Sequence, residues 1–143
     1  MREYRIEDEV LGCLVWDSEL EWWSSQIEIL TGQWIDVSVS PEDADPSAVF
    51  QRVRHTFCVI LEVEVNLRRS TADKLLNLYN TTWNDGLAIN QEEFINSITL
   101  DAIAFSPDGS ANLYYSDGDL FWGHTIITAI DKNGCFKDTM LAG

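Results

Sequence analysis

The chain has 143 residues, a length typical of one domain and sufficient to bury a core without metal or disulfide support. It carries 24 acidic and nine basic residues, and the formal net charge of -15 disfavours binding to a nucleic-acid backbone. No apolar stretch approaches the roughly 20 residues of a membrane-spanning helix, and the start MREYRIEDEV lacks the apolar core of a secretory signal. We therefore expect one cytoplasmic domain, residues 1–143, that binds neither nucleic acid nor membrane.

The first third of the chain predicts three strands. Residues 10–16 are apolar and β-prone. A second run covers residues 20–30, with apolar and polar side chains alternating at 26–29, and residues 34–40 alternate again. Turn-like segments at 17–19 and 31–33 separate them. Strands in series with short connections predict an antiparallel β-meander with one face toward a core.

The central part predicts helices. Residues 41–46 contain two prolines and end the sheet, and from about Ser47 apolar residues recur every three or four positions. Residues 59–65 also alternate and are β-branched, so a strand is the alternative there, but the helical stripe arrives in phase and favours a helix. We expect this helix to end at 68–71 and a second one to follow as far as 84–86.

A short third helix and four strands complete the chain. Asn90 with Glu93 three positions later predicts a capping box and a helix to about Ser97. Strand-like runs follow, separated by turn residues, at 100–105, 112–115, 123–130 and 135–141. The fold class is therefore α+β, with an N-terminal antiparallel β-meander, central helices and C-terminal antiparallel strands. The pattern leaves open whether the two strand blocks share one sheet.

Three cysteines, Cys13, Cys58 and Cys135, occur at long spacings without a CxxC pair. This pattern gives no support for a zinc site, and the odd number favours unpaired thiols in a reducing compartment. We expect Cys58 to pack in the core and no metal or other cofactor to be bound.

Four segments together resemble the uncharacterised bacterial domain-of-unknown-function family 2262. They are residues 11–17 with the pair Trp22-Trp23, residues 79–83, Phe94 with residues 100–103, and residues 114–124. The resemblance covers nearly the whole chain and implies a shared fold and a bacterial origin, but it supplies no catalytic residues. Similar small acidic domains occur as immunity proteins beside secreted toxins, so the resemblance also implies that role as a hypothesis.

One candidate site is the loop from Asp117 to His124. Asp117, Asp119 and His124 are spaced so that they could meet around a divalent ion, or Asp119 could orient His124 as a general base, with Trp122 beside them. The alternative is a structural hairpin loop in which the aspartates bind backbone N–H groups. The loop lacks the further oxygen ligands of a calcium-binding loop.

The second candidate site is the surface of the N-terminal strands. Residues 1–45 contain 12 acidic and two basic residues, a net charge of -10, and four of the six tryptophans. Neighbouring residues of a strand point to opposite faces, so one ring of the Trp22-Trp23 pair faces away from the core unless a second layer covers it. An exposed tryptophan among acidic side chains is typical of a protein interface. The predicted interface comprises Glu19, Glu21, Trp22, Trp23, Glu28 and Asp36.

These observations favour a non-enzymatic protein-binding module. The sequence has none of the nucleophile-elbow, phosphate-loop, dinucleotide or zinc-protease signatures, and it has only two histidines. An acidic surface attracts a basic partner, so a basic protein, and specifically a toxin neutralised by occlusion, is the leading hypothesis. The alternative is a small metal-binding or hydrolytic enzyme centred on the Asp117–His124 loop.

Overall fold

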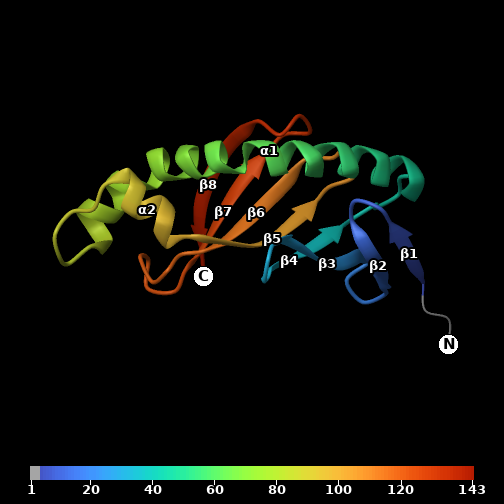
Figure 1. Cartoon of the computed structure of the whole chain (residues 1–143), viewed down its shortest axis with the longest axis horizontal. Coiled ribbons are helices and arrows are strands. Elements are labelled where there is room, and N and C mark those ends of the chain that lie inside the picture. The colour runs from blue at the N-terminus through green and yellow to red at the C-terminus, as the bar shows by residue number, and fades with distance from the viewer. Residues whose placement is uncertain (1–3) are drawn as a thin grey trace.

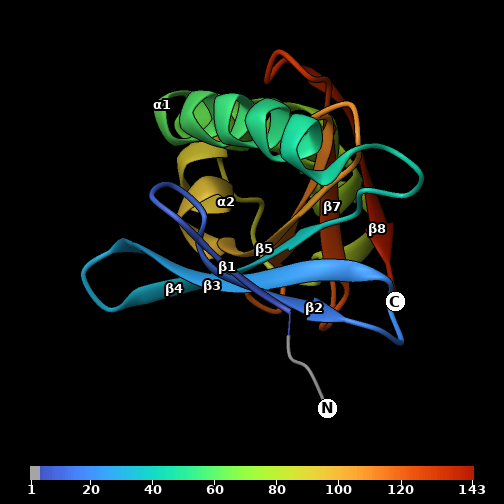
Figure 2. The same cartoon turned by 90° about the vertical axis from the view of Figure 1, so that its right-hand side faces the viewer.

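A computed structural model describes residues 4–143, except for the side chain of Leu30. Eight strands form one sheet in sequence order, and a single long helix crosses one of its faces (Figures 1 and 2). The elements, in chain order, are β1 Arg5–Asp8, β2 Gly12–Asp17, β3 Trp22–Leu30, β4 Gln33–Val39, α1 Pro46–Leu78, the π-helical turn η1 Tyr79–Trp83, α2 Gln91–Ser97, β5 Thr99–Phe105, β6 Ala111–Ser116, β7 Thr125–Ile130 and β8 Phe136–Ala142.

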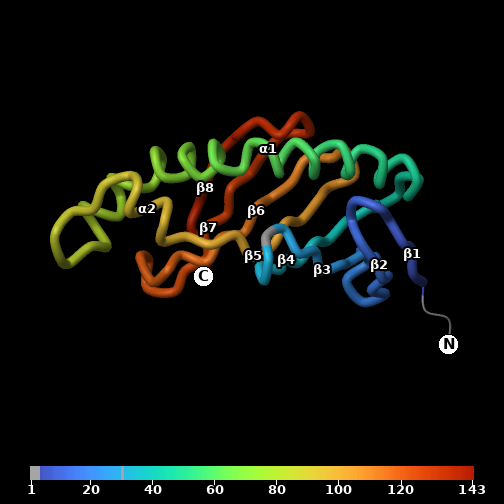
Figure 3. The backbone as a smooth tube through the Cα atoms, viewed as in Figure 1, coloured from blue at the N-terminus to red at the C-terminus, as the bar shows by residue number. Residues whose placement is uncertain are grey.

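The two strand blocks share this sheet, which settles the question that the sequence leaves open. Every neighbouring pair is antiparallel except β4 and β5, which run parallel with Val37 opposite Ile103. Parallel neighbours require a long crossover, and α1, η1 and α2 supply it. The tube in Figure 3 follows this path from β4 through the helices and back to β5. The α+β prediction is confirmed.

The helical segment differs from the sequence prediction at one point. The expected break at 68–71 is wrong, because α1 continues through it to Leu78 and η1 extends the helical path to Trp83. Neither glycine nor proline occurs between residues 47 and 83. Thr71 Oγ1 donates to Leu67 O while it contacts Thr128 Oγ1 on β7 at 2.6 Å. Packing against the sheet therefore keeps this threonine helical. The strand alternative for 59–65 is also excluded, since these residues lie within α1.

Other local predictions hold. The capping box at α2 is confirmed, because Asn90 Oδ1 accepts from Glu93 N and Glu93 Oε1 accepts from Asn90 N. The short edge strand β1 was not expected from the sequence, and it adds one strand to the N-terminal meander.

The core lies between α1 and one face of the sheet. Val49, Phe50, Val53, Phe57 and Ile60 of α1 are buried against inward-facing strand residues such as Ile35, Val37, Leu113 and Ile126. Their spacing in α1 is the apolar stripe expected from the sequence. None of the helices within residues 4–143 combines the length and the apolarity needed to cross a membrane.

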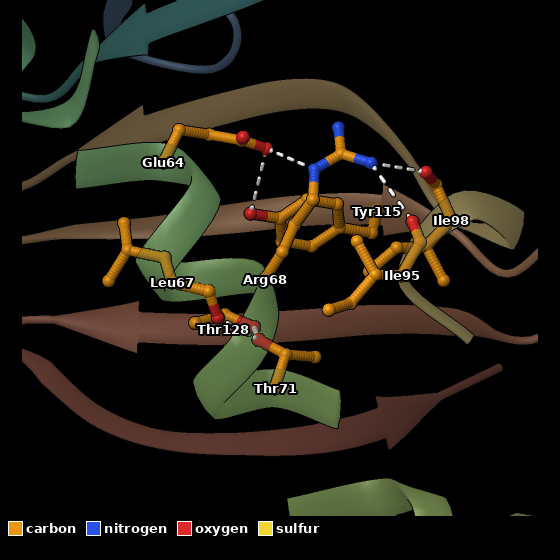
Figure 4. Close-up of polar contacts among 8 residues, drawn as sticks. All are labelled: Glu64, Leu67, Arg68, Thr71, Ile95, Ile98, Tyr115 and Thr128. Atoms are coloured by element: carbon orange, nitrogen blue, oxygen red, sulfur yellow. Dashed lines mark hydrogen bonds and ion pairs between the residues drawn. The ribbon is translucent and has the colours of Figure 1, made fainter. Parts of the chain in front are cut away.

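A partly buried polar network ties the middle of α1 to α2 and β6 (Figure 4). Arg68 Nε donates to Glu64 Oε1 at 2.6 Å, and Arg68 Nη1 donates to the carbonyls of Ile98 and Ile95 at 2.6 and 3.3 Å. The guanidinium also lies over the ring of Tyr115, 5.5 Å from its centre. Burial and the adjacent Glu64 carboxylate raise the pKa of Tyr115, so its hydroxyl stays protonated and donates to Glu64.

We expect Arg68→Met to cost about 2–3 kcal/mol of unfolding free energy, because it leaves the partly buried Glu64 carboxylate and two helix-end carbonyls without their donor. The measurement is urea unfolding followed by circular dichroism. The double variant Glu64→Gln, Arg68→Met removes the unpaired charge and should recover part of the loss. A double variant less stable than the single one would contradict this account.

Candidate functional site: the open face of the sheet

The face of the sheet opposite α1 carries the candidate site. Strand alternation sends Trp22, Ser24 and Gln26 of β3 to this face, while Trp23 and Ser25 face α1. Trp23 is only 8% exposed and packs edge-to-face on Phe50 with ring centres 5.8 Å apart. The two tryptophans therefore serve opposite faces. Trp22 lines the open face, whereas Trp23 belongs to the core and cannot contact a partner directly.

A groove of about 890 Å³ runs along this open face. Its lining includes small side chains from three neighbouring strands, namely Ser24, Ser38, Ala102 and Ala104, and the aromatic side chains of Trp22, Trp34 and Tyr114. Trp34 is 59% exposed although it lies in the middle of the sheet order. Small side chains beside large aromatic ones leave room for a protruding group, a form typical of interface pockets.

The charged side chains of strands β2 to β6 are all acidic. Strands β2 to β6 contain no lysine or arginine, and their four carboxylates are Asp17, Glu28, Asp36 and Asp101. Asp17 and Asp36 line the groove, and Glu28 follows Gln26 in the outward-facing alternation of β3. Asp36 Oδ1 accepts one hydrogen bond from Gln26 Nε2 at 3.0 Å. The groove is therefore lined by aromatic side chains and carboxylates, with no lysine or arginine among the described residues that line it.

Asp101 reaches the open face through an irregularity in β5. The register between β5 and β6 shifts between Leu100 and Ala102, so Leu100 and Ile103 are both buried while Asp101 is exposed and Ala102 lines the groove. The sequence pattern does not point to Asp101, because simple alternation places it on the same face as the buried Ile103. Asp101 is exposed overall, but the limited burial of its carboxyl raises the pKa of this group above its ordinary value, and the Asp36 carboxylate adds to this effect.

The predicted acidic residues flank this groove in different ways. Glu19 and Glu21 lie in the exposed β2–β3 turn, which Asp17 organises by accepting from the N–H groups of Glu19 and Leu20 at 2.9 and 3.0 Å. Glu28 Oε2 accepts from Gly32 N in the exposed β3–β4 turn. These two turns lie at opposite ends of β3, and of the predicted interface residues Trp22 and Asp36 line the groove itself. Trp34 was not among the predicted interface residues. It lies two positions before Asp36 in β4, so strand alternation places both side chains on the same face.

The Asp117–His124 loop is organised around Asp117. This side chain is 4% exposed and accepts from the backbone N–H groups of Asp119, Phe121 and Gly123 at 2.8–3.0 Å. His124 Nδ1 donates to Phe121 O at 2.5 Å, since a carbonyl only accepts. The loop thus holds His124 against its own backbone and turns Asp117 inward. This is the arrangement expected for a structural hairpin loop, in which an aspartate binds backbone N–H groups. Asp119 remains exposed.

Trp122 and His124 meet at a separate aromatic cluster. Trp83 of η1 lies edge-to-face with Trp122 and with His124, at 5.0 and 5.1 Å between ring centres. Trp122 is 72% exposed. Within residues 4–143, no three His, Cys, Asp or Glu side chains converge as a metal site.

The cysteines differ from expectation in one respect. No disulfide joins Cys13, Cys58 and Cys135, all of which lie in the described part of the chain. Cys58 is exposed on α1, so the prediction that it packs in the core is wrong. It lies off the apolar stripe, one position after the buried Phe57.

Fold and site together define an α+β domain with one helical layer and an open, acidic, aromatic sheet face. The chain belongs to the family described as an uncharacterized protein conserved in bacteria (DUF2262), whose family model matches residues 8–141. No curated protein and no solved structure matches the chain significantly.

We expect Asp101→Asn to stabilise the protein at pH 7 by less than about 1 kcal/mol, since the carboxylate is well exposed. A raised pKa means that the folded state holds the proton more tightly, so wild-type Asp101 lowers stability as pH rises above the ordinary Asp range. The gain should vanish below about pH 4, where the carboxyl is protonated in both states. The measurement is thermal melting across pH, with Asp43→Asn as an exposed control. A gain that persists at pH 3 would refute the electrostatic cause.

We expect Asp117→Ala to cost about 3 kcal/mol, because three loop N–H groups lose a charged acceptor. Asp119→Asn should change stability by less than about 0.5 kcal/mol, since the side chain is exposed and asparagine tolerates the left-handed backbone at φ 65°. Chemical denaturation of both variants makes the comparison. Equal losses in the two variants would show that the loop is not organised by Asp117.

Proposed function

We propose that this protein is a non-enzymatic binding module whose open sheet face docks a basic protein. The observation that carries the proposal is the charge of β2 to β6, which hold four carboxylates and no basic residue around an aromatic groove. Complementary charge accelerates encounter and excludes acidic partners. A partner side chain inserted beside Trp22 and Trp34 would provide the buried anchor that interfaces need.

The specific form that we propose is an immunity-type protein that neutralises a toxin by occlusion. Toxins that act on nucleic acid carry basic surfaces, because their substrates are polyanions. An acidic face can cover such a surface without any chemistry of its own. The partner to test is therefore the toxin-like C-terminal domain encoded by an adjacent gene.

We also infer a reducing cytoplasmic location. Cys58 and Cys135 are exposed thiols, and such thiols persist where glutathione and thioredoxin keep them reduced.

For binding to that domain, we expect association to slow steeply with salt while dissociation changes less. The triple variant Glu19→Gln, Glu21→Gln, Glu28→Gln should slow association further without unfolding the protein, since exposed charges contribute only about 0–1 kcal/mol each. Trp34→Ala should weaken affinity by roughly tenfold or more, chiefly through faster dissociation. Surface plasmon resonance at several salt concentrations gives both rates.

Two matched controls test whether the loss of binding comes from the open face or from any loss of negative charge or of an exposed aromatic ring. The variant Glu42→Gln, Asp43→Asn, Glu62→Gln removes the same charge from exposed positions outside β2 to β6, and Trp122→Ala removes an exposed ring from the distant β6–β7 loop. Both should bind nearly as the wild type does. Binding lost in the Trp122 variant and kept in the Trp34 variant would place the interface at the Asp117–His124 loop instead.

A further inference from the structure

A second cleft lies on the other side of the sheet, between the middle of α1 and strands β3 to β5. It has a volume of about 220 Å³, and its apolar walls include Ile29, Ile35, Leu61, Val65 and Leu100. A water molecule occupies about 30 Å³ in the liquid, so the cleft has room for a group the size of a branched side chain and its attached polar group. Among the described lining residues it shares only Ile103 with the open-face groove, which lies on the opposite face of the sheet.

Two wall residues of this cleft are unusually exposed for their type. Leu61 and Val65 of α1 are 53% and 58% exposed. The neighbouring apolar stripe of the same helix, which includes Ile60 and Leu67, is buried. An apolar ligand seated in the cleft would remove part of this surface from water, which is favourable by about 25 cal/mol for each Å².

The polar end of the cleft is formed by Glu64 and Arg68, which both line it. Arg68 uses Nε and Nη1, and Glu64 uses Oε1 for both Arg68 and Tyr115. Among the described residues, Nη2 of Arg68 and Oε2 of Glu64 have no hydrogen-bond partner, and no buried side-chain nitrogen or oxygen is left unsatisfied. These two atoms are therefore accessible, and Figure 4 shows both extending away from the bonds of the network.

The donor and acceptor are held in place before any ligand arrives. Arg68 is anchored by the carbonyls of Ile95 and Ile98 and by the face of Tyr115, which is fully buried. A side chain with its rotamer already restricted loses little conformational entropy on binding. Because Glu64 neutralises Arg68, the pair favours a neutral polar group over an anion.

We propose that this cleft binds a neutral carboxamide that carries a branched apolar group. The carbonyl oxygen of the ligand accepts from Arg68 Nη2, its N–H donates to Glu64 Oε2, and the apolar group lies between Leu61, Val65 and the wall from β3 to β5. A free small molecule and a leucine-like residue of a partner peptide share this chemistry.

The test uses two probes with the same carbon skeleton, 4-methylpentanamide and 4-methylpentanoate, titrated into the full chain. Nuclear magnetic resonance follows the Arg68 Nε–H and the backbone amides of residues 61–65. The carboxamide should shift these signals and bind at least about tenfold more tightly than the carboxylate, because Glu64 repels the anion and accepts the amide N–H. Equal affinities, or no shift with the carboxamide, would overturn the proposal.

Variants test the two halves of the cleft separately. Leu61→Asn should weaken the carboxamide several-fold with no loss of folding, and Leu78→Asn, an exposed position on the same helix outside the cleft, should leave binding unchanged. Glu64→Gln leaves Arg68 uncompensated and should reverse the preference toward the carboxylate. A Glu64→Gln protein that is folded by circular dichroism and still prefers the carboxamide would contradict the assigned polar contacts.

A third arm distinguishes the two sources of the ligand. If acetyl-Gly-Leu-Gly-amide shifts the same signals and binds more tightly than 4-methylpentanamide, the cleft receives a peptide. If only the small carboxamide binds, the ligand is a free molecule. Either result is independent of the open-face interface, since none of these variants alters β2 to β6.

Discussion

The position of Arg68 is the constraint on which much of this structure depends. One guanidinium joins α1 to the carbonyls at the end of α2, to Glu64 one turn earlier in the helix, and to the buried Tyr115 on β6. These bonds lock α2 against α1 just before the chain enters β5. Since β5 is the strand that pairs in parallel with β4, the ion pair helps to set the point where the two strand blocks join. A partly buried charge held by this many partners tolerates few other arrangements.

The parallel junction between β4 and β5 explains why one face of the sheet stays open. A parallel pair needs a long crossover, and the crossover contains one long helix that covers one face only. Strands β2 to β6 accommodate this by directing apolar side chains toward α1 and carboxylates away from it. The same topology that closes the core therefore exposes Trp22, Trp34 and Asp36 on a common surface.

Much of the architecture could be predicted because period-two and period-3.6 patterns are local signals. The phase of Ile35, Val37 and Val39 predicted the inward face of β4, and the Asn90–Glu93 pair predicted the start of α2. The continuity of α1 could not be predicted in the same way. Arg68 and Thr71 resemble a helix end by residue type, but their partners are Ile98 and Thr128, which lie far away in sequence.

The sequence by itself determined the fold class, the negative charge of the N-terminal strands and the separation of Trp22 from Trp23, because each follows from neighbouring residues. Only the tertiary structure decided which tryptophan faces outward, since that depends on which side of the sheet α1 covers. It also decided the role of Asp101, which a register shift against β6 displaces from its expected face. Such shifts arise from pairing between strands. Because the partner strand is a different segment of the chain, the local pattern of apolar and polar residues does not reveal them.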